Sequence, residues 1–358
     1  MINYESILLV ASRTPSGDNI QPWFFKVEDE SKKISIFHDH KLAFHSFNPE
    51  DIASSISFGM MLFLIEEEAL RQNYEMKYVV NEEAITNVDE AFIVCTFSEN
   101  TSERKALFSS EVVLKRRIGR GAYQKQAIPV KKLEQFLSEL NSENDLMNFS
   151  FSEKLSNTSV ADMKNMEHAF WNKKHCLQDI FKWVHFTSSS YYKTKRGFHR
   201  KELCVNPSEL SFIYLIKNMT GFSIWLFNVF AYLLVFNKFN QSLVNANFTM
   251  LSLKRRPTVS EWLLVGKSVM KYWLKMTEEG MVVQPMSIQS FFISFSEWGI
   301  CKDKWPSDIL ESLKMNLKSD FKIKSGYMPF WMYRIGYPHK RDTTFKSVRL
   351  SLDEMKKV

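Results

Sequence analysis

The chain has 358 residues, of which 45% are hydrophobic and 14% aromatic. This composition supplies a large apolar core and argues against a disordered protein. The formal net charge of +7 suits an anionic ligand, a phosphate-bearing cofactor or an acidic membrane surface. The basic residues are spread along the chain and no nucleic-acid-binding motif is present, so nucleic acid is not expected as a partner.

The cysteines and the N-terminal residues indicate the cellular compartment in which the protein is expected. The four cysteines lie far apart and form no CxxC pair, which favours neither a zinc site nor a disulfide framework: Cys95, Cys176, Cys204 and Cys301. The N-terminus lacks the basic segment, apolar run and small-residue cleavage site of a signal peptide. We therefore expect a cytoplasmic protein.

The first half, residues 1–105, is predicted to form one compact unit. A short helix leads into a loop of turn-forming residues, which is followed by a hairpin, a long amphipathic helix and two more strands. Gly59 in the long helix allows close approach of a neighbouring segment. The expected elements are a helix at 2–12, a loop at 14–19, strands at 23–27 and 33–37, a helix at 51–73, and strands at 76–80 and 92–97.

The second half, residues 106–358, is predicted to form a second unit. Its clearest element is a helix at 261–276, because Thr258 and Glu261 form a capping box and Gly280 suits a C-terminal cap. Further helices are expected at 129–140 and 306–317, and a late strand at 330–337.

The stretch at about 141–254 is less regular and is longer than a simple connection, which indicates a lid or a partner-binding insertion. Within it, residues 218–236 carry no formal charge. Three interpretations are open for this segment: a buried or lid helix, a segment that dips into a membrane surface, and a true span. The first is favoured, since polar residues dilute the run and no second span is present.

The most specific signal is the run T-P-S-G-D-N-I-Q-P-W at residues 14–23. A turn at Pro15 and Ser16 can present backbone N–H groups, and Asn19 and Gln21 offer amide donors and acceptors for the polar edge of a flat ring. A simple Asx-type turn before a hairpin is the alternative interpretation.

A second motif, R-R-I-G-R, occupies residues 116–120. Guanidinium groups suit a phosphate because each can donate two parallel charge-assisted hydrogen bonds. The alternative is a solvated basic start of a helix. Two weaker signals follow: G-M-V-V-Q-P-M-S at 280–287, and R-I-G-Y at 334–337.

These runs, taken together, resemble the patterns of the nitroreductase superfamily, whose P-S-x-x-N-x-Q-P-W and R-R-S-x-R motifs contact FMN. The resemblance covers about 5–140 and 255–340. It is greatest to the Acg-type branch, in which two nitroreductase-like units are fused; Asp39, the Ser57-Phe58-Gly59 run and the Trp262-Leu263-x-x-Gly266 run add to it. It implies an α+β fold of two units, each with a mainly antiparallel sheet flanked by helices, that meet as a pseudo-dimer around one FMN.

The resemblance also implies roles for individual residues. The 280–287 segment would form a Pro-containing loop over one face of the flavin, and Arg334 would close on the phosphate. Arg120 is the expected catalytic residue, because it would stabilise negative charge on the reduced flavin. The expected cofactor-binding residues are Arg13, Pro15, Ser16, Asn19, Gln21, Arg116, Arg117, Arg120, Pro285, Met286, Ser287 and Arg334.

The activity implied by the resemblance is that of an FMN-dependent oxidoreductase. NADPH, NADH or another donor would deliver hydride to the flavin, which would exchange it with a small organic substrate. The alternative is a protein that binds or sequesters FMN without turnover, since a lid would leave little room for a nicotinamide. A monomer that is internally a pseudo-dimer is expected, with a homodimer as the other possibility, and 218–236 is a candidate for peripheral membrane contact.

Other constellations are weaker. His38, His40 and His45 lie close in sequence, but no full ligand set accompanies them, so a solvated strand end is favoured over a metal site and no metal is expected. The chain has no GxGxxG, Walker loop, G-x-S-x-G or H-E-x-x-H motif. The interior histidines are interpreted as packed or exposed rather than as proton donors: His168, His175, His185 and His199.

Overall fold

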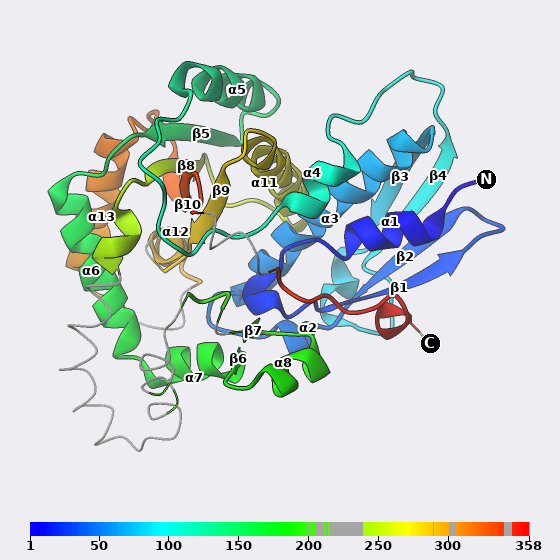
Figure 1. Ribbon diagram of the computed structural model, residues 1–358, viewed down its shortest axis with the longest axis horizontal. Coiled ribbons are helices and arrows are strands. Elements are labelled where there is room, and N and C mark those ends of the chain that lie inside the picture. The colour runs from blue at the N-terminus through cyan, green and yellow to red at the C-terminus, as the bar shows by residue number, and fades with distance from the viewer. Residues whose placement is uncertain are drawn as a thin grey trace.

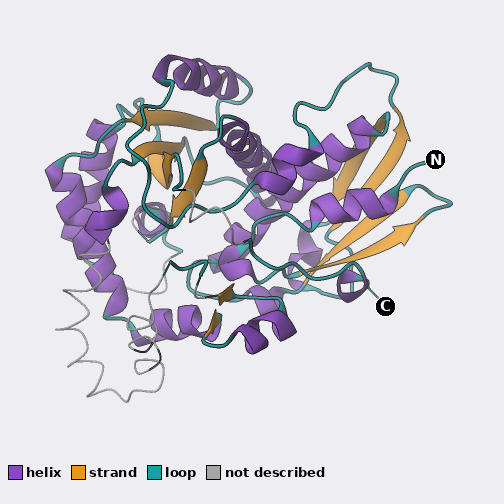
Figure 2. Cartoon of the chain, viewed as in Figure 1, coloured by secondary structure: helices purple, strands orange, loops and turns teal. Residues whose placement is uncertain are grey.

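The computed structural model describes residues 1–199, 201–204, 211, 214, 239–288, 290–300, 305–339 and 346–357. It contains two four-stranded antiparallel sheets flanked by helices, an α+β architecture (Figure 1; Figure 2). The apolar segment at 218–236 lies outside the described residues. Within the described ranges, no helix is long and apolar enough to cross a membrane.

The first sheet is built from the first half of the chain. Helix α1 (Tyr4–Ala11) precedes the hairpin of β1 (Trp23–Glu28) and β2 (Lys33–His38), and helix α3 (Ile52–Arg71) leads to β3 (Tyr74–Val80) and β4 (Ile93–Glu99). The strand order is β1-β2-β4-β3, with every neighbouring pair antiparallel. The expected helices, hairpin and two later strands are therefore all present.

The second sheet repeats this order. Strands β5 (Met147–Ser152) and β8 (Asn247–Leu253) pair as a hairpin, helix α11 (Val259–Glu278) follows, and β9 (Val282–Met286) and β10 (Met328–Gly336) complete the sheet. Its order is β5-β8-β10-β9. Each half therefore runs strand, strand, 20-residue helix, strand, strand. Both β5 and β8 fall inside the stretch 141–254 that the sequence assigned to an insertion.

Helix α11 begins and ends as its sequence predicts. The Thr258 hydroxyl accepts a hydrogen bond from the Glu261 N–H, and the Glu261 carboxylate accepts one from the Thr258 N–H, which completes the capping box. At the other end Gly280 has φ +76°, a left-handed conformation that terminates a helix at little cost when the residue is glycine.

Helices α3 and α11 cross between the two sheets at a pair of glycines (Figure 1). A Cβ on Gly59 would lie 2.1 Å from the Leu263 carbonyl oxygen, and a Cβ on Gly266 would lie 2.1 Å from the Ile56 carbonyl oxygen. Gly59 and Gly266 are each the eighth residue of their helix. The two contacts are reciprocal, because each glycine approaches the residue three positions before the other glycine. Such reciprocity is the mark of a twofold arrangement.

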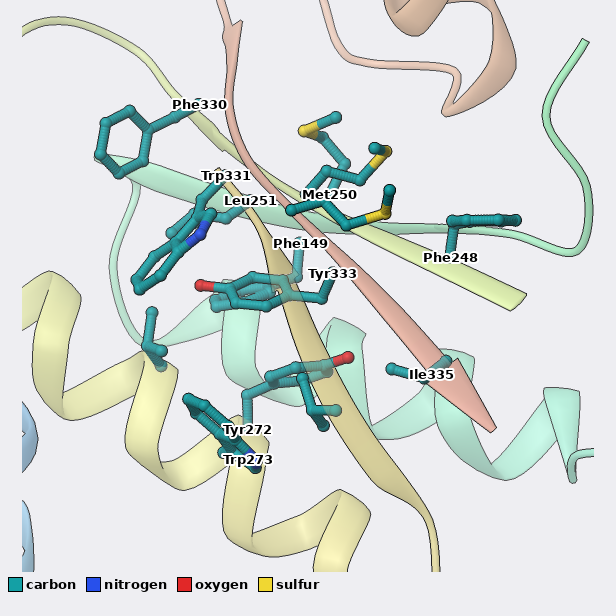
Figure 3. Packing of buried hydrophobic residues seen from close by; sticks show 14 of the residues in the cluster. Phe149, Phe248, Met250, Leu251, Tyr272, Trp273, Phe330, Trp331, Tyr333 and Ile335 are labelled. Carbon is teal, nitrogen blue, oxygen red and sulfur yellow. The ribbon is translucent and has the colours of Figure 1, made fainter. Parts of the chain in front are cut away.

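The larger core lies around the second sheet. In Figure 3 the Tyr272 ring from α11 lies next to the Tyr333 ring from β10, with centroids 5.5 Å apart. The Trp331 ring, also from β10, lies 5.0 Å from the Tyr333 ring. The Phe149 ring stacks on Tyr272 with centroids 5.3 Å apart. Helices α12 (Phe291–Glu297) and α13 (Ser307–Asp320) pack against β10 as well, which explains why nearly every residue of that strand is buried.

A long insertion separates the two strands of the second hairpin, at residues 153–246. Its described part contains α6 (Asn157–Trp171), α7 (Lys174–Lys182), β6 (Val184–His185), α8 (Ser188–Thr194) and β7 (Phe198–His199). Helix α6 packs on α13, and the following elements run beneath the junction of the halves in Figure 1. In the first half the corresponding connection is the short turn at 29–32.

The end of the chain returns to the first half. We call residues 346–357 the C-terminal arm. The Lys357 N–H donates to the Phe25 carbonyl oxygen at 2.8 Å, beside the outer strand β1. Leu350 and Met355 are buried in the core of the first half. The arm therefore ties the second half to the first (Figure 1).

Candidate functional site

The loop between α1 and β1 has a tight, unusual backbone. Asp18, Asn19 and Gln21 all have positive φ values, of 48°, 54° and 53°. Such values are uncommon for residues with a side chain, and Asn and Asp tolerate them best. The Ser16 hydroxyl accepts a hydrogen bond from the Gln21 N–H at 2.9 Å and closes the turn.

Arg116 links this loop to the second half. It follows helix α4 (Ser110–Lys115), and its Nη2 donates to the Arg13 carbonyl oxygen at 2.7 Å. Its guanidinium lies over the Trp273 ring, 4.8 Å from the centroid. The side chain is buried. Burial, followed by the positive charges of Arg349 and Arg13, lowers the pKa of Arg116 to about 9.

Arg349 is supplied by the C-terminal arm. Its Nη1 donates to the Asn19 amide oxygen. Burial and then the charge of Arg13 lower the pKa of Arg349 to about 10, against the opposing effect of Glu202 and Tyr191. We call Arg13, Arg116 and Arg349 the arginine cluster. Within it, the Nε atoms of Arg13 and Arg116 are buried and make no hydrogen bond with any residue that the structure describes.

Arg120 lies on the insertion side of the site. Its guanidinium lies over the Phe198 ring, 4.7 Å from the centroid. Burial lowers its pKa, while the carboxylates of Glu202 and Asp18 act in the opposite direction. Burial also raises the pKa of Asp18 to about 7; Arg120 opposes this shift and Asp179 adds to it. Asp18 therefore carries a pKa far above that of an ordinary aspartate.

The other two motifs adjoin the R-R-I-G-R turn. The Gly119 N–H donates to the Val283 carbonyl oxygen at 3.2 Å, which sets the turn against strand β9. The expected Pro-containing loop is thus wrong for residues 282–286, because they form a strand. Two valines favour this conformation, and Pro285 is tolerated because β9 is at the edge of the sheet. Met286 is buried, and the Ser287 carbonyl accepts the Phe291 N–H at 3.0 Å.

Arg334 makes hydrogen bonds with the turn that contains the R-R-I-G-R motif. Its Nη2 donates to the carbonyl oxygens of Gly119 and Gly121, both at 2.8 Å, and its Nη1 donates to the Ser242 carbonyl. The guanidinium stacks on Tyr123 at 4.2 Å. Arg334 is fully buried, so backbone carbonyls satisfy most of its donors. Its contacts position residues 119–121, and contact with a phosphate stays a prediction.

The side-chain amides of Asn19 and Gln21 make hydrogen bonds with the insertion and the C-terminal arm. The Asn19 Nδ2 donates to the carbonyls of Gly197 and Val348, each at 3.3 Å. The Gln21 Nε2 donates to the Lys195 carbonyl at 2.7 Å, and its Oε1 accepts from the Leu350 N–H at 3.0 Å. The insertion and the C-terminal arm therefore both rest on the loop, as a lid would.

A small pocket lies on the other side of the loop. The pocket is partly open, and its empty space between Ser16, Gly17, His45, Asn48 and Ser54 is about 230 Å³ with open solvent included. Ligand pockets usually enclose about 300–1,000 Å³, so this pocket is too small for a flavin nucleotide. Burial lowers the pKa of His45 to about 4, which keeps its imidazole neutral.

The structure brings the four motifs into one region, and it adds residues that sequence reasoning missed. Arg349, Glu202 and Tyr191 belong to no recognisable spacing, and only the paths of the arm and the insertion place them here. Pro15 is buried within the loop, whereas Arg117 is partly exposed. His38 contacts the Ile85 carbonyl at 2.7 Å and His40 contacts the Asp51 carboxylate at 2.5 Å. Among the residues described, no group of three His, Cys, Asp or Glu could hold a metal.

No family model and no curated protein matches the sequence. Among solved structures, the FMN- and NADPH-dependent nitroreductase NfnB from Sphigopyxis sp. strain HMH is 12% identical, with 69% of this chain and 97% of that chain covered and a TM-score of 0.38. NfnB from Mycobacterium smegmatis, solved with NADPH, is 12% identical (70% and 96% covered, TM-score 0.34).

A nitroreductase-like family protein from Bacillus cereus is 10% identical, with 71% of this chain and 98% of that chain covered and a TM-score of 0.34. At such identities and TM-scores, a function for this chain has to be argued from its own residues.

Proposed function

We propose that the chain is an FMN-dependent oxidoreductase whose arginine cluster binds the FMN phosphate. The main supporting observation is that burial, followed by the charges of Arg349 and Arg13, both partly exposed, lowers the pKa of the buried Arg116. The Nε atoms of Arg13 and Arg116 are buried and donate to none of the described residues. Clustered buried cations are costly unless an anion compensates them. A phosphate group supplies both the negative charge and the several acceptor oxygens that guanidinium groups need.

The remaining residues would act around this anchor. Bound FMN would supply the hydride-accepting and hydride-donating chemistry. Arg120 would provide positive charge to offset the negative charge that reduction adds, and Phe198 fixes its guanidinium. Arg334 would orient the 119–121 turn through its carbonyl contacts. The proposed cofactor-binding set also includes Pro15, Ser16, Asn19, Gln21, Arg117, Pro285, Met286 and Ser287.

In the proposed function, the two halves of the chain are fused units of one pseudo-dimer. Their identical strand order and the reciprocal crossing at Gly59 and Gly266 support it. The loop of Asn19 comes from the first half, and Arg116 comes from the second. One site per chain follows, because the loop and the arginines occur together only once.

A second candidate function is FMN binding without turnover. It is favoured by the hydrogen bonds from Asn19 and Gln21 that hold the insertion on the loop, since an insertion that stays there covers the proposed site. NADPH or NADH would then have no access to bound flavin.

The two candidates are distinguished by colour and its loss. The purified chain should bind FMN, identified after release from the denatured protein. Under anaerobic conditions, bleaching of bound FMN by NADPH or NADH supports the oxidoreductase. Persistent yellow colour with both donors supports a binding protein, and a colourless chain that takes up no added FMN refutes both.

A further inference from the structure

Three segments that are far apart in sequence close on one another beside the arginine cluster. They are the loop at 16–21, the insertion at 191–202 and the C-terminal arm. The Val348 N–H donates to the Tyr191 hydroxyl at 2.9 Å, and the Ser347 hydroxyl donates to the Glu202 Oε1. On the outer side, the Lys195 ammonium donates to the Glu354 Oε2 at 2.6 Å.

Two carboxylates therefore join the insertion to the arm. The charge of Glu202 acts on Arg120 and Arg349, whereas that of Glu354 acts on Arg196. Glu202 Oε2 accepts the His199 N–H at 2.8 Å, which fixes its carboxylate at the end of β7. Its negative charge favours the charged forms of both Arg120 and Arg349. Glu354 lies on the outer side, partly exposed, where it pairs with Lys195 and Ser351.

This arrangement supplies an internal counter-ion to a positively charged site. An incoming phosphate would need the same guanidinium groups, and two anions cannot share them without repulsion. We infer that Glu202 is a built-in competitor for the anion site, so that a phosphate-bearing ligand displaces Glu202 and releases residues 191–199 from the loop. Release would also remove the hydrogen bond from Asn19 to Gly197 and the one from Gln21 to Lys195. The inference rests on the proposed phosphate-binding role of the arginine cluster.

The first test compares Glu202→Gln with Glu354→Gln in the full chain, by titration with inorganic phosphate. Glutamine keeps a hydrogen-bond acceptor and removes the charge. Glu202→Gln should bind phosphate about tenfold more tightly than the unaltered chain, the scale expected for removal of one nearby competing charge. Glu354→Gln should bind as the unaltered chain does. Equal affinity in all three proteins would overturn the inference alone, whereas no binding by any of them would refute the proposed function too.

The second test follows three amides whose hydrogen bonds cross between segments: Gly197 to the Asn19 carbonyl, Val348 to Tyr191, and Leu350 to Gln21. Hydrogen exchange at 191–199 should rise when FMN or inorganic phosphate is added, while exchange in α11 should stay unchanged. Glu202→Gln should show the faster exchange without ligand. Unchanged or slower exchange at 191–199 on ligand addition would mean that the insertion does not give way, and would overturn the inference.

Discussion

The two sheets share one strand order but differ in what surrounds them. The first has a short turn at 29–32 between its hairpin strands, and its outer face is partly open, as the 72% exposure of Val79 shows. The second has residues 153–246 in the corresponding place, and helices cover both faces, so most of β8 and β10 is buried. The common parts build the scaffold, and the unlike parts meet at the arginine cluster. The difference teaches that the residues proposed to bind FMN come largely from the parts in which the two halves are unlike.

The largest expected effect is a loss of stability on substitution of the glycines at the crossing of α3 and α11, a feature that both halves share. Gly59→Val and Gly266→Val each force a side chain into a backbone carbonyl that lies 2.1 Å from the new Cβ. We expect each to destabilise the fold by roughly 3 kcal/mol or more, because backbone cannot move aside as a flexible side chain can. Urea denaturation measures the loss. Leu264→Ala, at a partly exposed position of α11, is the control; a small effect from either glycine variant would contradict a reciprocal crossing.

The second prediction compares the loss of stability on replacing a buried arginine of the second half with that on replacing an exposed arginine of the first half. Arg334→Met removes three hydrogen bonds to carbonyls and leaves those carbonyls buried, so we expect a loss of about 3 kcal/mol. Arg104→Met in the first half removes an exposed pair with Glu66 and should cost at most about 0.5 kcal/mol. Thermal unfolding of both variants checks this ranking, and equal losses would show that Arg334 does not hold the 119–121 turn.

A third prediction addresses the site between the halves. Arg116→Gln and Arg349→Gln should each weaken FMN binding on the order of 100-fold, since each removes a charge-assisted contact to the phosphate. Riboflavin lacks the phosphate, so its affinity should change little in either variant. Calorimetric titration with the two flavins gives the comparison, with Arg255→Gln, an exposed arginine paired with Glu261, as the control. Parallel losses for FMN and riboflavin would mean that the phosphate lies elsewhere.

The smallest effect is a dependence of stability on pH. The folded-state pKa of Asp18 is raised to about 7, above the unfolded value of 3.8, so the folded state holds the proton more tightly. Its contribution is therefore fully present below about pH 4 and is lost as the pH rises through 7. Asp18→Asn should remove this slope and stabilise the fold by at least about 1 kcal/mol at pH 8.

Denaturation in urea at pH values from 4 to 8 measures the pH slope for the unaltered chain and for Asp18→Asn. The exposed substitution Asp29→Asn serves as the control. A slope that survives in Asp18→Asn would assign the titration to another group.

Much of the scaffold could be predicted from local signals. The capping box at Thr258 and the periodic apolar positions of α3 are short-range features, and both helices form where the sequence indicates. Strands β5 and β8 were not recognised, because the partner of each lies across the insertion and a pairing over that distance leaves no turn signal between them. The 282–286 segment was wrongly expected as a loop, since its pairing with β10 depends on tertiary contacts.

The candidate site likewise contains some residues that the sequence indicated and others that it did not. The loop at 14–23 and the turn at 116–120 are contiguous motifs, and their residues meet through Arg13 and Arg116. Arg349 and Glu202 reach the site only because the arm and the insertion fold back over it. No spacing in the sequence reveals such a return, so these residues could be found only from the structure.

The decisive measurement is the stoichiometry and phosphate dependence of flavin binding by the unaltered chain, followed by calorimetry. One FMN per chain, with riboflavin bound at least about 100-fold more weakly, is the result expected for a single anchor of clustered arginines. Two FMN per chain, equal affinity for riboflavin, or no binding would contradict a single phosphate site formed between unlike halves.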